Sequence, residues 1–171
     1  MAKDDITRHI LSVRVQDIEG IISRVTGMFT RRGYNLISLV SARTETEGIN
    51  RLTIVVDASE VVIEQVTKQL NKLINVLKIV EQDPETSVSR ELILIKVRCD
   101  ANNRIQVVQT AELFRAKVID VAPESVTLEA TGTRDKLDAL LRVLDPFGIR
   151  EIVQSGTIAL GRGPKSMTAT R

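Results

Sequence analysis

The chain of 171 residues has one cysteine and one histidine, and each scarcity excludes whole classes of protein. With Cys99 alone no disulfide can form within the chain, so the reducing cytoplasm is the expected compartment. Cys99 lies in an apolar stretch, where we expect a buried small hydrophobe rather than a reactive thiol. With His9 alone, Ser-His and Cys-His catalysis and multi-histidine metal sites are excluded as familiar patterns.

Aromatic residues make up only 2% of the chain, and the net charge is +2 with acids and bases interspersed. A sheet that stacks bases would need aromatic side chains on its strands, and a phosphate-binding surface would need a basic block. Nucleic acid is therefore not an expected partner. The first residues lack the apolar core of a signal peptide, and no apolar run is long enough to cross a membrane. We expect a soluble cytoplasmic protein without a membrane partner.

The most informative stretch is residues 13–35, VRVQDIEGIISRVTGMFTRRGYN. It begins as an alternating strand, breaks in a loop at residues 16–20, and continues as an amphipathic helix. Gly33 supplies a left-handed stop before the next strand. The helix is expected to bury an apolar stripe made of Ile21, Ile22, Val25, Met28 and Phe29.

The loop that leads into this helix is a candidate anion site. Backbone N–H groups at a helix N-terminus have no acceptor within the helix and suit a small anion such as an amino-acid carboxylate. Asp and Gly are also common at strand-loop-helix junctions for turn and capping reasons alone. The motif by itself therefore leaves a purely structural interpretation open.

Hydrophobic periodicity predicts the order β-α-β-β-α-β for the first half of the chain. Helices are expected after the first and third of four strands, which cover residues 8–15, 36–43, 51–57 and 76–80. Pro84 interrupts the pattern and marks a domain boundary. The same order then repeats, with strands over residues 90–98, 117–121, 125–130 and 149–153 and a further short stretch at 157–160.

The repeated order predicts an α+β protein made of two consecutive ferredoxin-like βαββαβ units. The first domain is expected over residues 5–84 and the second over residues 88–163. Residues 164–171 are small and polar and are expected to form a flexible tail.

No catalytic constellation is visible in the sequence, since there is no nucleophile with a base, no pair of facing carboxylates and no metal cluster. The glycines of residues 161–163 are too few for a dinucleotide loop and lack its structural context. Asp135 and Asp138 are typical of a solvated helix surface. We therefore expect no catalytic residue and no metal site, and a binding or regulatory role by elimination.

The D-x-x-G motif of Asp17 to Gly20, within a β-α-β-β-α-β unit, resembles an ACT domain, a small amino-acid-sensing module. More specifically, ILSVRVQDIEGIISRVTGMFTRRGYNLISL (residues 10–39) is similar to the start of the regulatory, or small, subunit of acetohydroxyacid synthase (acetolactate synthase). Further stretches agree with that family in the right order and cover nearly the whole chain: NRLTIVV (50–56), EQVTKQLNKLINVLKI (64–79), SRELILIKV (89–97), FRAKVIDVAPES (114–125), GTRDKLDALL (132–141) and QSGTIALGRG (154–163).

The resemblance implies a regulatory subunit of a transferase, with no active site of its own. Such a subunit would bind and activate a catalytic (large) subunit and confer feedback inhibition by a branched-chain amino acid, valine first among them. It would act in valine, leucine and isoleucine synthesis. No cofactor is implied on this subunit, whereas thiamine diphosphate, Mg and FAD are expected on the catalytic partner. Pairing of ACT domains implies a homodimer.

The resemblance also implies an effector site at the interface of two ACT domains. One chain would supply the loop and helix start, and the partner chain would supply Asn35. The carboxylate of Asp17 would accept from the effector ammonium, and the N–H groups of Ile21 and Ile22 would face its carboxylate. The complete set of implied effector-binding residues is Asp17, Ile18, Glu19, Gly20, Ile21, Ile22, Asn35, Leu36 and Ile37.

Two other functions are compatible with parts of the sequence. A free-standing amino-acid-sensing ACT module acting on a different partner would share the loop, but a transcription factor would add a DNA-binding segment, and neither a helix-turn-helix nor a basic face is visible. A small enzyme on a ferredoxin-like scaffold would need a convergent catalytic pair, and the sequence shows none.

Overall fold

The computed structural model describes residues 6–168. The chain divides into two compact units. The first contains residues 6–88 together with residues 157–168, and the second contains residues 89–156.

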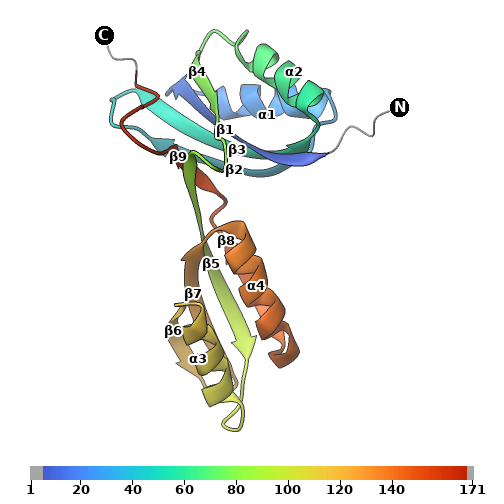
Figure 1. Cartoon of the computed structure of the whole chain (residues 1–171), viewed down its shortest axis with the longest axis vertical. Coiled ribbons are helices and arrows are strands. Elements are labelled where there is room, and N and C mark those ends of the chain that lie inside the picture. Colours follow the sequence, from blue (N-terminus) through green and yellow to red (C-terminus); the bar gives the residue numbers. More distant parts are fainter. Residues whose placement is uncertain (1–5, 169–171) are drawn as a thin grey trace. The chain divides into compact units, whose positions relative to one another are not determined.

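The first unit is a four-stranded antiparallel sheet with both of its helices on one face (Figure 1). Its strand order is β2-β3-β1-β4. This is the ferredoxin-like arrangement that the order of hydrophobic patterns predicted. The elements of this sheet-and-helix layer are β1 (Thr7–Gln16), α1 (Ile21–Arg31), β2 (Leu36–Arg43), β3 (Ile49–Ala58), α2 (Glu60–Leu70) and β4 (Val76–Glu81).

The core of the first unit lies between the sheet and its helices. Alternate residues of β1, Leu11, Val13 and Val15, are fully buried, and α1 packs Val25 and Phe29 against them. The prediction that Ile22 belongs to this buried stripe is wrong, because its side chain is 43% exposed. At about 100° per residue, position 22 lies at the edge of the stripe defined by the other apolar residues of α1.

Helix α1 ends at Arg31, two residues before the glycine that the sequence predicted as its stop. Gly33 has φ +69°, and the N–H of Tyr34 reaches back to the carbonyl of Phe29 at 3.1 Å. This combination of a left-handed residue and a backward hydrogen bond satisfies carbonyls at the end of the helix. The chain can therefore turn directly into β2.

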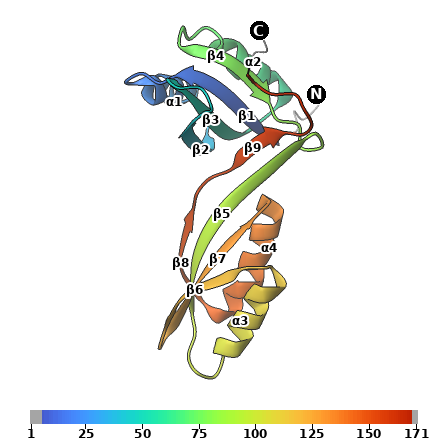
Figure 2. The same ribbon diagram turned by 90° about the vertical axis from the view of Figure 1, so that its left-hand side faces the viewer.

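The second unit repeats the arrangement, with α3 and α4 on one face of a sheet of order β6-β7-β5-β8 (Figure 2). Its core includes Ile93, Ile95 and Leu128, all fully buried. Cys99 is 1% exposed, which confirms that it is a buried residue. The elements are β5 (Ser87–Arg98), whose first two residues belong to the first unit, α3 (Arg104–Leu113), β6 (Lys117–Ala122), β7 (Ser125–Gly132), α4 (Arg134–Leu144), a 3-10 turn (Asp145–Phe147) and β8 (Ile149–Gln154).

The chain then returns to the first unit through residues 157–168, which we call the C-terminal segment. It contains β9 (Ile158–Gly161), which pairs with β5. The N–H of Arg162 donates to the carbonyl of Thr86 at 2.8 Å, and the Nη2 of Arg51 donates to the carbonyl of Ala159 at 2.8 Å. These partners belong to the first unit, so residues 157–163, which the sequence placed in a second domain of residues 88–163, are hydrogen-bonded to the first unit.

The tail expected at residues 164–171 is described only as far as residue 168, and residues 169–171 lie outside the described part of the chain. Thr168 donates its hydroxyl hydrogen to Oε1 of Glu45 at 2.8 Å, and Nη1 of Arg14 lies 3.0 Å from the same hydroxyl. The described end of the tail is therefore bonded to the first unit.

The C-terminal segment lies against the sheet face opposite α1 and α2. On β1, Ser12 and Arg14 alternate with the core residues and so point to that opposite face, yet they are only 0% and 7% exposed. A one-layer sheet would leave such polar residues in water. Residues 157–168 cover these side chains, so this part of the sheet is covered on both faces.

Candidate functional site

The loop between β1 and α1 is held in place by the neighbouring hairpin. The N–H of Asp17 donates to the carbonyl of Gly48 at 2.8 Å, so the loop is bonded to the β2–β3 connection. Gly20, the residue before α1, has φ +77°, a left-handed conformation that glycine adopts without a steric penalty. The predicted loop glycine therefore sets the direction in which the helix begins.

At the start of α1, the two backbone donors that the sequence assigned to an effector carboxylate differ in their surroundings. The N–H of Ile21 donates to the carbonyl of Ile18 at 3.3 Å. Ile22, the second helical residue, is among the first-turn positions whose N–H groups have no acceptor within the helix. An anion at this end would therefore be bound first through the amide of Ile22.

The side chains around the loop are mostly open to solvent. Ile18 is 37% exposed and Ile22 43% exposed, so both can contact an aliphatic ligand group. The Ile21 side chain is 4% exposed and packs in the core, so only its backbone belongs to the loop surface. Glu19 is also exposed and adds a negative charge beside the helix start.

The carboxylate of Asp17 is fixed by a partner that sequence reasoning missed. Asn50 donates its side-chain amide to Oδ1 of Asp17 at 2.8 Å. The register of β1 and β3 explains the contact, because Asn50 lies opposite Val15 and hence next to the strand end that leads to Asp17. A second oxygen of the carboxylate remains for a cationic ligand group. The βαββαβ order implies that the first and third strands pair in antiparallel fashion. That pairing could have predicted that Asn50 lies near Asp17.

Asp17 also lines a polar cavity of about 330 Å³ at this end of the sheet. Arg43 at the end of β2 contributes a positive charge to the same cavity. An ammonium-accepting carboxylate and a cation in one depression suit a zwitterion. The remaining lining residues come from the β2–β3 connection and the start of β3: Thr44, Thr46, Glu47, Gly48, Ile49 and Asn50.

The other predicted site residues, Asn35, Leu36 and Ile37, lie at the opposite end of β2. Leu36 pairs with Val56, whereas Arg43 at the loop end pairs with Asn50. At about 3.3 Å per residue, the length of β2 separates these two ends by roughly 20 Å. Asn35 is exposed, Ile37 is 39% exposed, and Leu36 packs partly against the core. A single chain therefore does not bring the two halves of the predicted site together.

The one histidine has structural partners rather than a nucleophile. Nδ1 of His9 lies 2.6 Å from Oε1 of Glu81, and its Nε2 lies 3.0 Å from the Thr7 hydroxyl and 3.2 Å from the carbonyl of Ala58. The ring is 5% exposed. Within residues 6–168, no group of three or more His, Cys, Asp or Glu side chains is placed to hold a metal ion. No helix in this described part of the chain is long and apolar enough to cross a membrane.

Two family descriptions match the chain, one for each half. An "AHAS small subunit-like ACT domain" matches residues 11–78, and the "Small subunit of acetolactate synthase" description matches residues 90–163. The first matched range contains the whole β1–α1 loop and the β2–β3 hairpin described above.

Similar proteins extend the likeness over nearly the full length. The acetolactate synthase small subunit of Mycobacterium bovis is 61% identical over 93% of this chain and 95% of its own. That of Mycolicibacterium smegmatis is 56% identical over 95% of this chain and 96% of its own. The crystal structure of the Thermotoga maritima small subunit superimposes with a TM-score of 0.85 at 38% identity, covering 94% of this chain and 100% of that one. The chain therefore belongs to the family of acetolactate synthase small subunits.

Proposed function

We propose that this chain is a non-catalytic regulatory subunit that activates the acetolactate synthase catalytic subunit and makes it sensitive to a branched-chain amino acid, with valine as the first candidate. The observation that carries the proposal is the β1–α1 loop. In a member of this family, a fixed carboxylate, a free helix-start N–H and exposed aliphatic side chains meet at one end of the sheet.

Each part of a branched-chain amino acid has a matching group at this loop. The second carboxylate oxygen of Asp17 accepts from the effector ammonium. The N–H of Ile22 at the positive end of α1 donates to the effector carboxylate. The exposed side chain of Ile18 contacts the aliphatic branch, which asks for no hydrogen bond.

The proposed effector site is completed by a second copy of the chain. Within one chain, Asn35 and the β1–α1 loop lie at opposite ends of β2. Strand β2 is the outer strand of its sheet, so an antiparallel neighbour would place the Asn35 end of one copy beside the loop end of the other. A homodimer through the first units would then hold two equivalent effector sites.

The chemistry of the reaction belongs, in this proposal, to the catalytic subunit. Thiamine diphosphate, Mg and FAD would be bound there, and this chain would act on that subunit in the cytoplasm by binding and by responding to the effector. The proposal separates activation from sensing, since activation needs contact with the catalytic subunit and sensing needs the loop.

Calorimetric titration of valine, leucine and isoleucine into the purified chain tests the sensing half of the proposal. We expect saturable binding of one of the three at one site per chain, and its loss in the Gly20→Asp variant. Binding of none, both to the isolated chain and to its complex with the catalytic subunit, would refute a sensing role.

An assay of acetolactate formation tests activation. Adding this chain to an acetolactate synthase catalytic subunit should raise its turnover, and the identified effector should then reduce it. A chain that neither binds nor activates the catalytic subunit would contradict the proposal and favour an ACT module acting on a different partner.

A further inference from the structure

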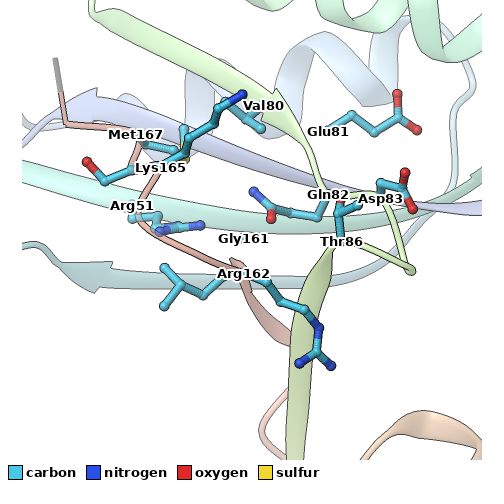
Figure 3. Close-up of a pocket in the computed structure, with 12 residues that line it drawn as sticks. Arg51, Val80, Glu81, Gln82, Asp83, Thr86, Gly161, Arg162, Lys165 and Met167 are labelled. Atoms are coloured by element: carbon cyan, nitrogen blue, oxygen red, sulfur yellow. The ribbon is translucent and has the colours of Figure 1, made fainter. Parts of the chain in front are cut away.

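The C-terminal segment and the sheet face beneath it line a second cavity in the first unit, of about 430 Å³ and open to solvent on one side (Figure 3). This size is within the range of small-molecule sites. It lies on the face opposite the helices, and its lining shares no residue with the cavity at Asp17. Val80 and Leu160 supply apolar surface, and a few polar side chains project into the same space.

Gln82, just after β4, is the first of these polar side chains. The residue is 5% exposed, and its side-chain amide has no hydrogen-bond partner among the described residues. In Figure 3 this amide points into the cavity, toward Arg51. The backbone of Gly161 is close by, since a Cβ built on it would lie 3.9 Å from Oε1 of Gln82. An amide that faces the cavity and has no partner among the described residues is a group that a ligand can reach and satisfy.

Arg51 on β3 faces Gln82 across the cavity (Figure 3). Its Nη2 donates to the Ser12 hydroxyl and the Ala159 carbonyl, each at 2.8 Å, but its Nε is buried and has no acceptor among the described residues. Burial lowers the pKa of Arg51, an effect that Glu45 opposes and Arg14 increases. No carboxylate of the described chain lies within ion-pair distance of the Arg51 guanidinium. An anion bound at the part of the guanidinium that lines the cavity would balance its charge.

The two acidic side chains of the cavity wall are already engaged elsewhere. Glu81 contacts His9, and Oδ1 of Asp83 accepts from the N–H of Glu85 at 2.8 Å. In Figure 3 both carboxylates point away from the space between Arg51 and Gln82. Lys165, exposed on the C-terminal segment, adds a second positive charge to the lining. The space between the arginine and the amide is therefore electropositive.

We propose that this cavity is a second ligand site, which binds a small molecule carrying a carboxylate or phosphate group. The oxyanion accepts from the Arg51 guanidinium and from the amide of Gln82, and Lys165 contributes at the solvent side. The apolar part of the ligand lies against Val80 and Leu160. Because Lys165 and Leu160 belong to the C-terminal segment, the ligand joins that segment to the sheet.

Nuclear magnetic resonance of the full-length chain tests the site directly, with inorganic phosphate and butyrate as separate probes. The Nε–H of Arg51 and the side-chain amide of Gln82 each give a signal that responds to a bound oxyanion. We expect saturable shifts of both signals with at least one probe. Phosphate as the tighter probe would indicate a phosphorylated ligand, and butyrate as the tighter probe would indicate a carboxylic acid.

Variants then locate the site. Gln82→Leu keeps the shape of the buried side chain and should weaken binding about tenfold or more, because it removes a hydrogen bond to a charged group. Lys165→Ala should weaken binding about two- to fivefold, as expected for an exposed charge. Lys72→Ala, an exposed lysine outside the cavity, and Gly20→Asp, at the effector loop, should leave binding unchanged.

Two results would overturn the proposal. One is the absence of saturable shifts at Arg51 and Gln82 with both probes up to tens of millimolar. The other is binding that persists unchanged in both Gln82→Leu and Lys165→Ala. Loss of binding in Gly20→Asp with retention in Gln82→Leu would assign the anion to the effector loop and would likewise reject a second site.

Discussion

Substitutions of Gly20 can separate the effect of backbone strain on effector affinity from the effect of charge. Its φ of +77° disfavours any side chain, but asparagine tolerates this left-handed conformation better than most residues. A Cβ at position 20 would meet no atom within 4 Å, so the space itself admits a side chain. We expect Gly20→Asp to reduce effector affinity more than tenfold, because a carboxylate beside the α1 N-terminus competes with the effector carboxylate for the same donors.

The matched control is Gly20→Asn, which has nearly the same size and backbone demand but no charge. It should lose less affinity than Gly20→Asp when both are titrated by calorimetry, and both should still activate the catalytic subunit. Equal losses would mean that loop conformation, rather than competition at the helix start, controls binding.

Glu45, in the β2–β3 connection, reports on the attachment of the C-terminal segment. The hydrogen bond from Thr168 lowers the pKa of Glu45 to about 2, with backbone hydrogen bonding and Arg14 also favouring the ionised form. Because this pKa is below the ordinary 4.5, the contribution of the ionised Glu45 is complete above about pH 4.5 and is lost as the pH falls toward 2. We expect the contact of residue 168 with the hairpin to weaken over this acidic range and to be intact at neutral pH.

Thr168→Val tests this contact with a nearly isosteric side chain. Removing the donated hydrogen bond should raise the pKa of Glu45 toward 4.5, as measured from the carboxyl carbon signal during an acid titration. The carboxyl of Glu64, whose pKa is lowered by Lys68 on α2, serves as an internal control and should not move. An unchanged Glu45 pKa would show that residue 168 does not hold this carboxylate in solution.

Among the elements, those with local periodicity were predictable. The strand β1, the helix α1 and the glycine stop at Gly33 follow from residue patterns only a few positions long, and the structure confirms them. Ile22 was assigned to the core because it is apolar and adjacent to the stripe, but neighbouring tertiary surface decides burial at a stripe edge. The local sequence pattern therefore predicts the type of an element more reliably than it predicts the exposure of a residue at the edge of an apolar stripe.

The contacts that could not be predicted form between residues that are far apart in the sequence. Asn50 becomes a partner of Asp17 only through the register of β1 and β3. The sequence of the C-terminal segment predicts a short strand and a polar tail. Its own residues do not indicate which face of the sheet it packs against. Arg14 and Arg51, which look like solvent-facing residues of alternating strands, are what bind it.

Removal of residues 157–171 tests the contribution of the C-terminal segment to the first unit. The truncated chain loses the partners that Arg14 and Arg51 find in Thr168 and Ala159, and the pairing of β9 with β5. At about 1 kcal/mol per hydrogen bond, we expect the free energy of unfolding to fall by roughly 2–4 kcal/mol in urea titration. Hydrogen exchange should show lost protection in β1 and β3, with β7 of the second unit as the control. Equal loss in β7 would mean that the segment stabilises the chain as a whole.

For the whole molecule, the two predicted halves of the effector site meet only if two chains pair through their first units. Asn35 is exposed and makes no contribution to the core, so Asn35→Ala should leave the melting temperature unchanged. It should weaken effector binding about tenfold, the effect of one lost hydrogen bond to a charged group. Unchanged binding would remove Asn35 from the site.

A mixed dimer distinguishes a shared site from a site within one chain. In a dimer of one Gly20→Asp chain and one Asn35→Ala chain, sharing puts both defects into one site and leaves the other with a normal loop and a normal Asn35. Calorimetry on such a dimer, purified through two different affinity tags, should then find one effector site of normal affinity per dimer. The Gly20→Asp homodimer should have none, and the Asn35→Ala homodimer should have two weakened sites. If loop and Asn35 acted within the same chain, the mixed dimer would have two damaged sites and no normal one, because each chain carries one of the substitutions.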